Sequence, residues 1–313
     1  MSERRDLVER FRADLDRLLP DPSARIGLAV SGGPDSMAML LLAAEAVPDR
    51  IDCATVDHGL RAEAAVEAAL VAEACARLGV SHSILRVEVE RGASIQAAAR
   101  AARYAALEDW AAAGGLMAIA TAHHADDQAE TLLMRLDRGA GLSGLVGIRA
   151  CRPLGRVMVI RPLLGWRREA LRAVVADTPT VDDPSNSDPR HDRSRVRRLL
   201  ATLDGQVDID RMAMSAVHLA EAEEALAWTV EEAMRSRVTS CPNGRILADV
   251  EGLPREITRR ILARLIGGAD SHVDGPTLDS AMRRLEQGST ATVGRLKLSP
   301  GRRILIEKAP PRR

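Results

Sequence analysis

A short polar stretch between an apolar run and a helical pattern holds the residues best suited to chemistry: Ser31, Gly32, Gly33, Pro34, Asp35 and Ser36. Glycines let the backbone approach a ligand closely, and backbone N–H groups at the start of a helix attract an anion. Asp35 would repel a bare phosphate, so its presence predicts a Mg²⁺ ion between its carboxylate and the phosphate oxygens. The stretch therefore predicts a phosphate site, and a tight turn with an Asp or Ser helix cap is the alternative. It matches neither the Walker A loop, which requires a lysine, nor the dinucleotide G-x-G-x-x-G pattern.

A second set of polar residues recurs at helical spacing further along the chain. If His124 opens a helix, Asp127 and Glu130 follow it along one face. Two carboxylates on one face suit a cationic amine or a metal ion. The alternative is that Asp126 and Asp127 favour the positive end of the helix dipole while Glu130 lies in solvent.

Further candidates are an acidic residue, a histidine and a series of arginines. Asp57 and His58 follow the second apolar run, a position where an acidic residue often contacts a ribose. Arg100 and Arg103 lie in an alanine-rich helical pattern, either as surface charges or as phosphate contacts. The densest basic run, a candidate phosphate-binding surface or a solvated helix face, contains Arg190, Arg193, Arg195, Arg197 and Arg198.

The elements that must position these residues alternate regularly through the first half of the chain. Alternating short apolar runs and helical patterns predict a Rossmann-like α/β fold, a parallel sheet with helices on both faces. Its ligands bind at the carboxyl ends of the strands, where the polar stretch, Asp57 and His124 fall. The predicted strands are 26–30, 51–56, 80–87, 116–121 and 157–160, and the predicted helices are 37–46, 62–78, 94–113, 125–136 and 167–177.

The pattern changes beyond residue 205. We predict one long helix at 207–237, followed by a turn, two helices at 254–266 and 277–287, and two strands at 292–298 and 303–307. The chain is therefore divided into a catalytic domain, 1–205, and a connector helix with a small α+β domain, 206–313. An amphipathic helix is also predicted at the amino terminus, from the spacing of Leu7, Phe11, Leu15 and Leu18.

Composition excludes several classes of protein. The four cysteines form no C-x-x-C pair, which argues against a disulfide scaffold, a zinc site or an iron–sulfur cluster. No apolar run is long enough to span a membrane and the amino terminus has no signal-peptide pattern, so we expect a cytoplasmic protein. The formal net charge is zero, and Lys297 and Lys308 are the only lysines among 44 basic residues. Arginine binds phosphate with better geometry than lysine, because its guanidinium can form two hydrogen bonds to one phosphate. A compositional bias also explains why arginine is abundant here.

The 31–36 stretch resembles the pyrophosphate loop, SGGxDS, of the N-type ATP pyrophosphatases. Enzymes of that superfamily cleave ATP between its α- and β-phosphates, adenylate a carbonyl oxygen of the substrate, and let a nucleophile displace AMP. The resemblance implies that the loop holds the departing pyrophosphate.

Other motifs, in the expected order, narrow the resemblance to one family. Together they resemble the short form of the tRNA(Ile)-lysidine synthetases over most of residues 26–198. Ser194 departs from that family's R-N-x-x-R segment, in which it replaces asparagine. The matching motifs are VDHGLR at 56–61, ARxxRY at 99–104, AHHADDQAET at 122–131, RGAGLSGLVGI at 138–148, RPLL at 161–164 and DPSN at 183–186.

This resemblance implies a reaction with ATP and Mg²⁺ as cofactors. ATP activates the carbonyl oxygen at carbon 2 of the wobble cytidine in a tRNA(Ile) with a CAU anticodon. The ε-amine of free L-lysine then attacks that carbon and displaces AMP, giving lysidine, which reads AUA. The sequence leaves the oligomeric state open, with a homodimer among the expectations.

The resemblance also implies roles for individual residues. We expect Asp35 to bind the metal and arginines to stabilise the departing pyrophosphate. Asp127 and Glu130 are expected to hold the lysine ammonium and accept its proton. The expected catalytic set is Asp35, Arg103, His124, Asp127 and Glu130; the nucleotide set is 31–36 with Asp57, His58 and Arg100; the tRNA set is Arg193, Arg195, Arg197 and Arg198.

Three alternatives share parts of this pattern. A tRNA thiolase uses the same adenylation step but usually requires paired cysteines or a cluster. Small-molecule ligases such as NAD and GMP synthetases share the loop, although no glutaminase motif is visible here. An ATP- or RNA-binding relative that has lost catalysis is the third.

Overall fold

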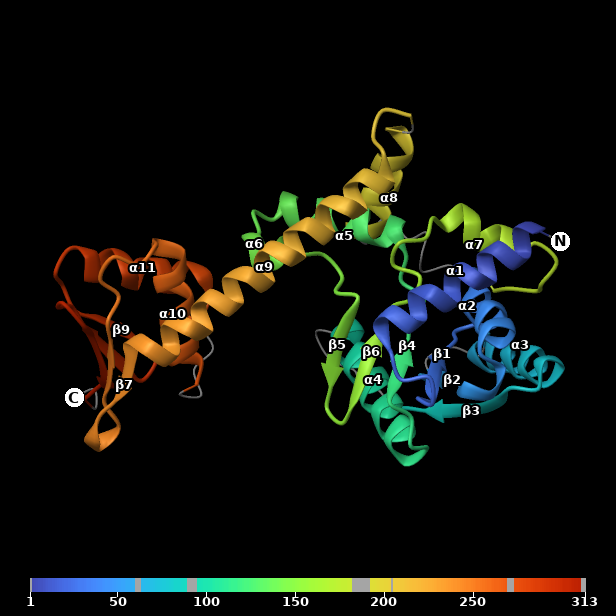
Figure 1. Ribbon diagram of the computed structural model, residues 1–313, viewed down its shortest axis with the longest axis horizontal. Helices are drawn as coiled ribbons and strands as arrows, with labels where there is room; N and C mark the ends of the chain where they lie inside the picture. The colour runs from blue at the N-terminus through green and yellow to red at the C-terminus, as the bar shows by residue number, and fades with distance from the viewer. Residues whose placement is uncertain are drawn as a thin grey trace. The chain divides into compact units, whose positions relative to one another are not determined.

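The computed structural model describes residues 2–59, 63–88, 95–181, 192–203, 205–268 and 273–310. The chain divides into two compact units, Met1–Ala220 and Glu221–Arg313, and each contains its own sheet (Figure 1). The functional division at residue 205 stays a prediction. The end of the VDHGLR motif, the DPSN motif and Arg190 lie outside the described residues.

The first unit is built on a six-stranded sheet with the order β3-β2-β1-β4-β6-β5. Neighbouring strands are parallel throughout, except that β5 pairs antiparallel with β6 at one edge. The predicted parallel α/β sheet is confirmed, and strand β5 was not predicted. The strands are β1 (Ile26–Ala29), β2 (Ile51–Asp57), β3 (Ser81–Arg86), β4 (Ala118–Ala120), β5 (Cys151–Leu154) and β6 (Val157–Ile160).

Helices cover both faces of this sheet because its strands are apolar on both sides. Leu28 and Cys53 face one core, shared with α1 (Ser2–Leu18), α2 (Pro34–Ala46), α3 (Glu63–Leu78) and α7 (Arg168–Val174). The neighbouring residues Ala29 and Ala54 face the other core, which contains Leu107 of α4 (Ile95–Ala113). The predicted amphipathic first helix is also confirmed, since Phe11 and Leu15 are buried.

The helix after β1 begins three residues earlier than predicted, at Pro34 instead of Met37. Proline suits the first helical position because its fixed φ is helical and its missing N–H has no partner there. The helix start therefore lies inside the polar stretch. This places Asp35 and Ser36 in the first turn, with Gly33 as the N-cap.

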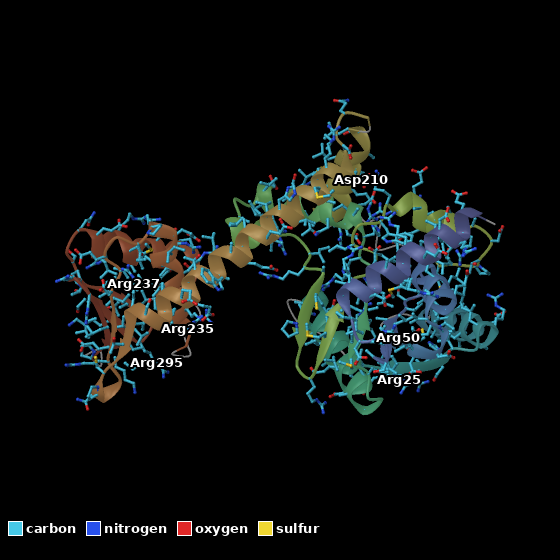
Figure 2. All side chains as sticks on the ribbon, in the orientation of Figure 1. Arg25, Arg50, Asp210, Arg235, Arg237 and Arg295 are labelled. Atoms are coloured by element: carbon cyan, nitrogen blue, oxygen red, sulfur yellow. The ribbon has the colours of Figure 1, made fainter. Side chains whose placement is uncertain are left out.

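Arginines also brace the amino ends of the strands, far from the site expected at their carboxyl ends. Arg25 pairs with Asp52 at 2.5 Å and donates to the carbonyl of Gly114. Arg50 donates to the carbonyls of Ala24 and Asp21 (Figure 2). These guanidiniums serve the fold, so arginine alone does not mark a ligand site in this chain.

Three helices complete the first unit: α5 (Ala125–Asp137), the short α6 (Leu142–Leu145) and α8 (Asp192–Thr202). The basic run of the sequence forms α8, which packs against α5. The long predicted helix is confirmed as α9 (Ile209–Arg237), which contributes residues to both units.

The second unit is an α+β domain, as predicted. Its antiparallel sheet has the order β7-β8-β11-β10-β9, and its core includes Leu262, Met282 and Leu298. The helices are α10 (Arg255–Gly267) and α11 (Gly275–Glu286), and the strands are β7 (Val238–Ser240), β8 (Ile246–Ala248), β9 (Ala291–Val293), β10 (Leu296–Ser299) and β11 (Ile304–Lys308).

One predicted strand of this unit, 292–298, is wrong. The segment is a hairpin of β9 and β10, which turns at Gly294 and Arg295. Gly294 has a φ of 56°, a conformation that glycine adopts without steric cost. A two-residue turn therefore interrupts what the apolar pattern presented as one continuous strand.

None of the helices in the described part of the chain has the length and apolar character needed to cross a membrane.

The packing of α4 on β1 predicts that Gly27 tolerates no side chain. A Cβ atom at Gly27 would lie 2.4 Å from Cζ3 of Trp110. We expect Gly27→Ala to cost about 1–3 kcal/mol of unfolding free energy, as overpacking typically does, measured by urea denaturation. Gly165→Ala is the matched control, because a Cβ atom there meets nothing within 4 Å; equal midpoints for the two variants would contradict this packing.

The ion pairs of α10 predict that the second unit weakens in acid. Hydrogen bonds from Arg259 and Arg260 lower the pKa of Glu256 from 4.5 to about 2. Because the folded unit favours the charged form, this stabilisation is full above pH 4.5 and is lost as the pH falls towards 2. We expect Glu256→Gln to reduce the difference in α10 hydrogen exchange between pH 6 and pH 3. Glu232→Gln, which removes a partly exposed carboxylate of α9 that pairs with Arg235, should leave that difference unchanged.

Candidate active site

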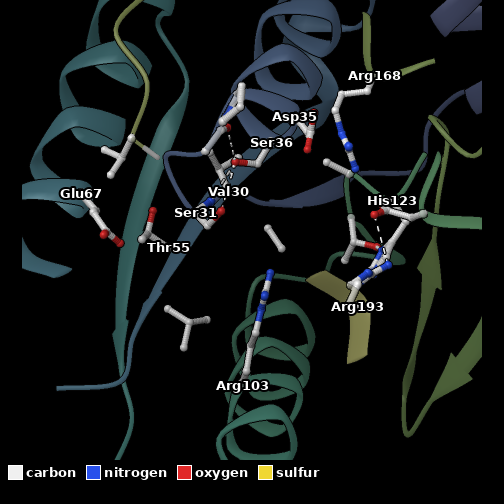
Figure 3. Close-up of a pocket in the computed structure, with 18 of the residues that line it drawn as sticks. Val30, Ser31, Asp35, Ser36, Thr55, Glu67, Arg103, His123, Arg168 and Arg193 are labelled. Carbon is white, nitrogen blue, oxygen red and sulfur yellow. Dashed lines mark hydrogen bonds and ion pairs between the residues drawn. The ribbon is translucent and has the colours of Figure 1, made fainter. Parts of the chain in front are cut away.

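A cavity of about 880 Å³ opens at the carboxyl ends of β1, β2 and β4 (Figure 3). Its walls include the polar stretch after β1, His58 after β2, and residues of α4, α5, α7 and α8. Parallel strands bring their carboxyl ends to one edge of the sheet, so segments distant in sequence meet there. The sequence-predicted residues that line it are Ser31, Gly33, Pro34, Asp35, Ser36, His58, Arg103, Asp127, Arg193, Arg197 and Arg198.

The polar stretch forms a closed loop around the start of α2. The Ser36 hydroxyl donates to the carbonyl of Gly33 at 2.9 Å and accepts from the backbone N–H of Ser31 at 3.1 Å. Gly32 has a φ of 85°, which requires glycine, and its carbonyl accepts from the N–H of Val181 at 2.9 Å. The first turn of α2 is thereby fixed with its free N–H groups at the cavity, an arrangement that suits an anion.

Asp35 presents an unsatisfied carboxylate at the same place. Its Oδ1 atom is buried and has no hydrogen-bond partner among the described residues. Its Oδ2 atom lies 3.4 Å from Nε2 of His124. A buried carboxylate oxygen without a donor is costly, and a cation would satisfy it.

His124 is fully buried among three carboxylates. Its ring nitrogens lie 3.4 to 3.6 Å from oxygens of Asp35, Asp126 and Asp127. Burial opposes the charged form, but the carboxylates outweigh it and raise the pKa of His124 to about 9. His124 is therefore an imidazolium at neutral pH and connects the loop after β1 to the first turn of α5.

Glu130 is the centre of a larger ion cluster. Its side chain is 1 % exposed, and its two oxygens accept from Arg168 at 3.0 Å, Arg193 at 2.8 Å and Arg197 at 2.7 Å. Arg193 also donates to Asp127 at 3.1 Å. Burial raises the pKa of Glu130, but Arg197 and the other arginines outweigh this and lower it. The alternative that Glu130 lies in solvent is wrong, and its bonded oxygens do not line the cavity.

Arg103 points into the cavity from the opposite wall (Figure 3). Burial lowers the pKa of its guanidinium, and among the described residues no carboxylate pairs with it. Arg100, three residues earlier, lies instead over the ring of Tyr104, 5.1 Å from its centroid. Of the two, only Arg103 lines the cavity.

Three other predicted residues lie away from the cavity wall. Asp57 accepts a hydrogen bond from the N–H of Gly59 at 2.9 Å. Arg195 pairs with Asp137 and Asp192 on the exposed side of α8. Gly32 shapes the loop without lining the cavity. Their roles in ligand binding stay predictions.

Several lining residues were not singled out in the sequence. Arg168 and Arg172 lie one turn apart on α7, and Glu67 and Thr55 lie at the β2 side. Thr121 and His123 lie at the end of β4; His123 belongs to the 122–131 motif but was given no role of its own. Ser194, the departure from the family motif, is 7 % exposed and also lines the cavity.

Comparison with known proteins agrees with this geometry. A family model described as the PP-loop domain, an ATP-binding family, matches residues 7–203. A solved structure with the same fold is the U34-tRNA thiolase NcsA from Methanococcus maripaludis, with a TM-score of 0.56 and 15 % identity. The alignment covers 69 % of this chain and 80 % of that one.

Curated relatives match over nearly the full length. The tRNA(Ile)-lysidine synthase of Novosphingobium aromaticivorans is 47 % identical, covering 93 % of this chain and 90 % of that one. Those of Zymomonas mobilis and Ruegeria pomeroyi are 39 % and 42 % identical, covering 97 % and 96 % of this chain and 94 % and 74 % of theirs. This chain is therefore a member of the tRNA(Ile)-lysidine synthase family, with an ATP-using PP-loop domain at its amino-terminal end.

Proposed function

We propose that the protein joins L-lysine to carbon 2 of the wobble cytidine in a tRNA(Ile) with a CAU anticodon, converting ATP to AMP and pyrophosphate. The observation that carries this proposal is that one cavity combines the 31–36 loop, Asp35 and the unpaired Arg103. The names of the full-length relatives support the same substrate and product. A cytoplasmic location follows from the proposed tRNA substrate.

In this proposal the loop binds the two phosphates that leave. The N–H groups at the start of α2 and the hydroxyl groups of Ser31 and Ser36 are the donors for pyrophosphate. Arg103, which no carboxylate of the described residues pairs with, contacts the phosphoryl group that stays on the cytidine. Phosphates from ATP would thus occupy the part of the cavity richest in uncommitted donors.

The residues present fit a Mg²⁺ ion at Asp35, whose buried Oδ1 atom has no donor within the described parts of the chain. No group of three or more metal-ligating side chains occurs in the described residues. This agrees with an ion held by one carboxylate together with phosphate oxygens and water, as Mg²⁺ usually is. When bound there, the ion would neutralise charge on the departing pyrophosphate.

Asp127 is the better candidate to receive the lysine amine. It lines the cavity and accepts from one guanidinium, that of Arg193, and from the backbone N–H of His124, whereas Glu130 does not line the cavity and accepts from three guanidiniums. The ammonium has a reference pKa of about 10.4, so it must lose a proton before it attacks. We therefore assign proton acceptance to Asp127, and to Glu130 the task of holding Arg168, Arg193 and Arg197 in place.

Recognition of tRNA is assigned to arginines and the second unit. Arg198 lines the cavity and has no ion-pair partner among the described residues, which suits a backbone phosphate. Arg193 and Arg197 also line the cavity, but both are paired with Glu130. The second unit would add contacts that separate this tRNA from others with the same anticodon.

A tRNA thiolase is disfavoured by the cysteines. All four are free thiols, and none is among the described residues that line the cavity. Sulfur transfer at this site would lack the paired cysteines or cluster on which such enzymes usually rely. The similarity to the Methanococcus maripaludis thiolase is a similarity of fold.

The proposed reaction is tested with purified protein, ATP, radiolabelled lysine and tRNA transcripts. We expect lysine to be incorporated into tRNA(Ile) with a CAU anticodon, with one AMP formed per lysine, and no incorporation into tRNA(Met). Incorporation of sulfur, formation of ADP, or no incorporation would refute the proposal. Light scattering on the same preparation tests the predicted homodimer.

Replacement of Asp35 separates adenylation from tRNA binding. We expect Asp35→Ala to reduce AMP formation by at least about 100-fold, because the leaving charge loses its stabilisation, while tRNA affinity stays within about twofold. Asp49→Ala, an exposed carboxylate before β2, is the control and should behave like the wild type. Parallel loss of tRNA binding and activity would indicate a different role.

The ion cluster around Glu130 predicts different effects if this residue positions the three arginines and if it binds lysine. Glu130→Gln removes the negative charge that three guanidiniums share, and of these only Arg193 keeps a carboxylate partner among the described residues, Asp127, so we expect a stability loss of about 1–3 kcal/mol. The KM values for ATP and tRNA should rise at least about threefold, while the KM for lysine changes less. A rise in the lysine KM alone would mean that Glu130 binds lysine. Glu169→Gln, an exposed neighbour on α7, should change none of these values.

A further inference from the structure

The imidazole of His123 lines the cavity but has no part in the reaction proposed for this site. His123 follows β4, and its Nδ1 atom lies 3.0 Å from the hydroxyl oxygen of Thr121. Thr121 itself is 3 % exposed, and its backbone N–H donates to the carbonyl of Ile160 at the end of β6. The strand ends therefore fix the ring from one side, while its other side lines the cavity (Figure 3).

The second ring nitrogen of His123 is uncommitted. Within the described residues, Thr121 is its only hydrogen-bond partner. The ring is oriented by one nitrogen, so the remaining Nε2 atom is available to a molecule in the cavity.

The groups that face His123 are cations. Burial lowers its pKa to about 3, and four arginines add to the effect: Arg161 after β6, Arg193 of α8, and Arg100 and Arg103 of α4. A second proton on the ring would repel these guanidiniums. The ring is therefore neutral at physiological pH, in contrast to the adjacent His124, which three carboxylates keep charged.

The chemistry of this wall selects an acceptor-rich ligand. Guanidinium groups only donate hydrogen bonds. If the Thr121 hydroxyl donates to Nδ1, the proton of the neutral ring resides on Nε2, and that nitrogen is also a donor. Arg103 and His123 then present only donors to the cavity, and phosphoryl oxygens are the acceptors that match such a pair.

We propose that His123 is a nucleotide-binding residue, whose uncharged ring donates a hydrogen bond from Nε2 to a phosphoryl oxygen of ATP. This inference deepens the proposed function and rests on it for the identity of the nucleotide. It is separate from the 31–36 loop, because His123 belongs to the β4 end of the cavity and acts through one fixed donor. The role requires a hydrogen bond and no proton transfer.

The test compares His123→Gln with His123→Ala. A glutamine amide retains an N–H donor, whereas alanine removes it. We expect alanine to weaken ATP binding, measured by calorimetry without tRNA, by about 10- to 100-fold, the usual effect of losing a hydrogen bond to a charged group. Glutamine should restore affinity to within about threefold of the wild type, and both wild type and His123→Gln should have the same pH dependence of AMP formation between pH 6 and 8.

His82 offers a matched control, because its Nε2 atom is also hydrogen-bonded to a threonine, Thr55, at 2.9 Å, but its ring does not line the cavity. We expect His82→Ala to lower the melting temperature without changing ATP affinity more than about twofold. Equal ATP affinities for His123→Ala and His82→Ala would overturn the proposal. So would failure of glutamine to rescue, or an ionisation near pH 6.5 that disappears in His123→Gln, which would mark a general acid or base.

The same variants show whether the phosphate that His123 contacts belongs to ATP or to tRNA. If His123→Ala weakens tRNA binding in a filter assay while ATP affinity is unchanged, the ring contacts the RNA backbone and the proposal is wrong. ATP binding is measured without RNA. A failure to form lysidine would therefore refute the proposed function, but the effect of the His123 variants on ATP affinity could still be interpreted.

Discussion

The site depends on one buried carboxylate that joins three helices. Glu130 of α5 binds Arg168 of α7 and both Arg193 and Arg197 of α8. The two helices of the arginines are separated in sequence by residues 175–191, yet their guanidiniums meet at one point. A buried carboxylate is tolerated only when it is paired and hydrogen-bonded, and here all its acceptor positions are used. The cavity wall opposite the sheet is built around this pairing.

The charge balance of the arginines divides them into two groups. Arg168, Arg193 and Arg197 share the single negative charge of Glu130, and Arg193 also pairs with Asp127, whereas Arg103 and Arg198 carry charge that no described carboxylate offsets. A zero net charge conceals this local excess. The uncompensated guanidiniums, the N–H groups at the start of α2 and the ring of His123 all favour anionic oxygen, so the cavity is suited to a nucleotide before any partner binds.

Sequence reasoning predicted the features that depend on local pattern. The parallel strands, the loop before α2, and the shared face of His124, Asp127 and Glu130 follow from periodicity and turn chemistry, and each element is present. It did not predict the burial of Glu130, since that burial requires arginines 38 to 67 residues away. Nor does helical spacing reveal that Arg103 enters the cavity while Arg100 stacks on Tyr104, because tertiary packing decides which side of α4 meets the site. The hairpin of β9 and β10 was missed because its two-residue turn interrupts the apolar pattern only briefly.

The scarcity of lysine has a chemical consequence for the proposed reaction, in which carbon 2 of a base becomes electrophilic. Lys297 lies in β10 and Lys308 in β11, so the unit that encloses the cavity contains no side-chain primary amine. Guanidinium groups stay protonated and are poor nucleophiles, so they stabilise the activated base without reacting with it. In the proposed reaction, an activated base bound beside these arginines would therefore meet no side-chain amine of the first unit that could attack it.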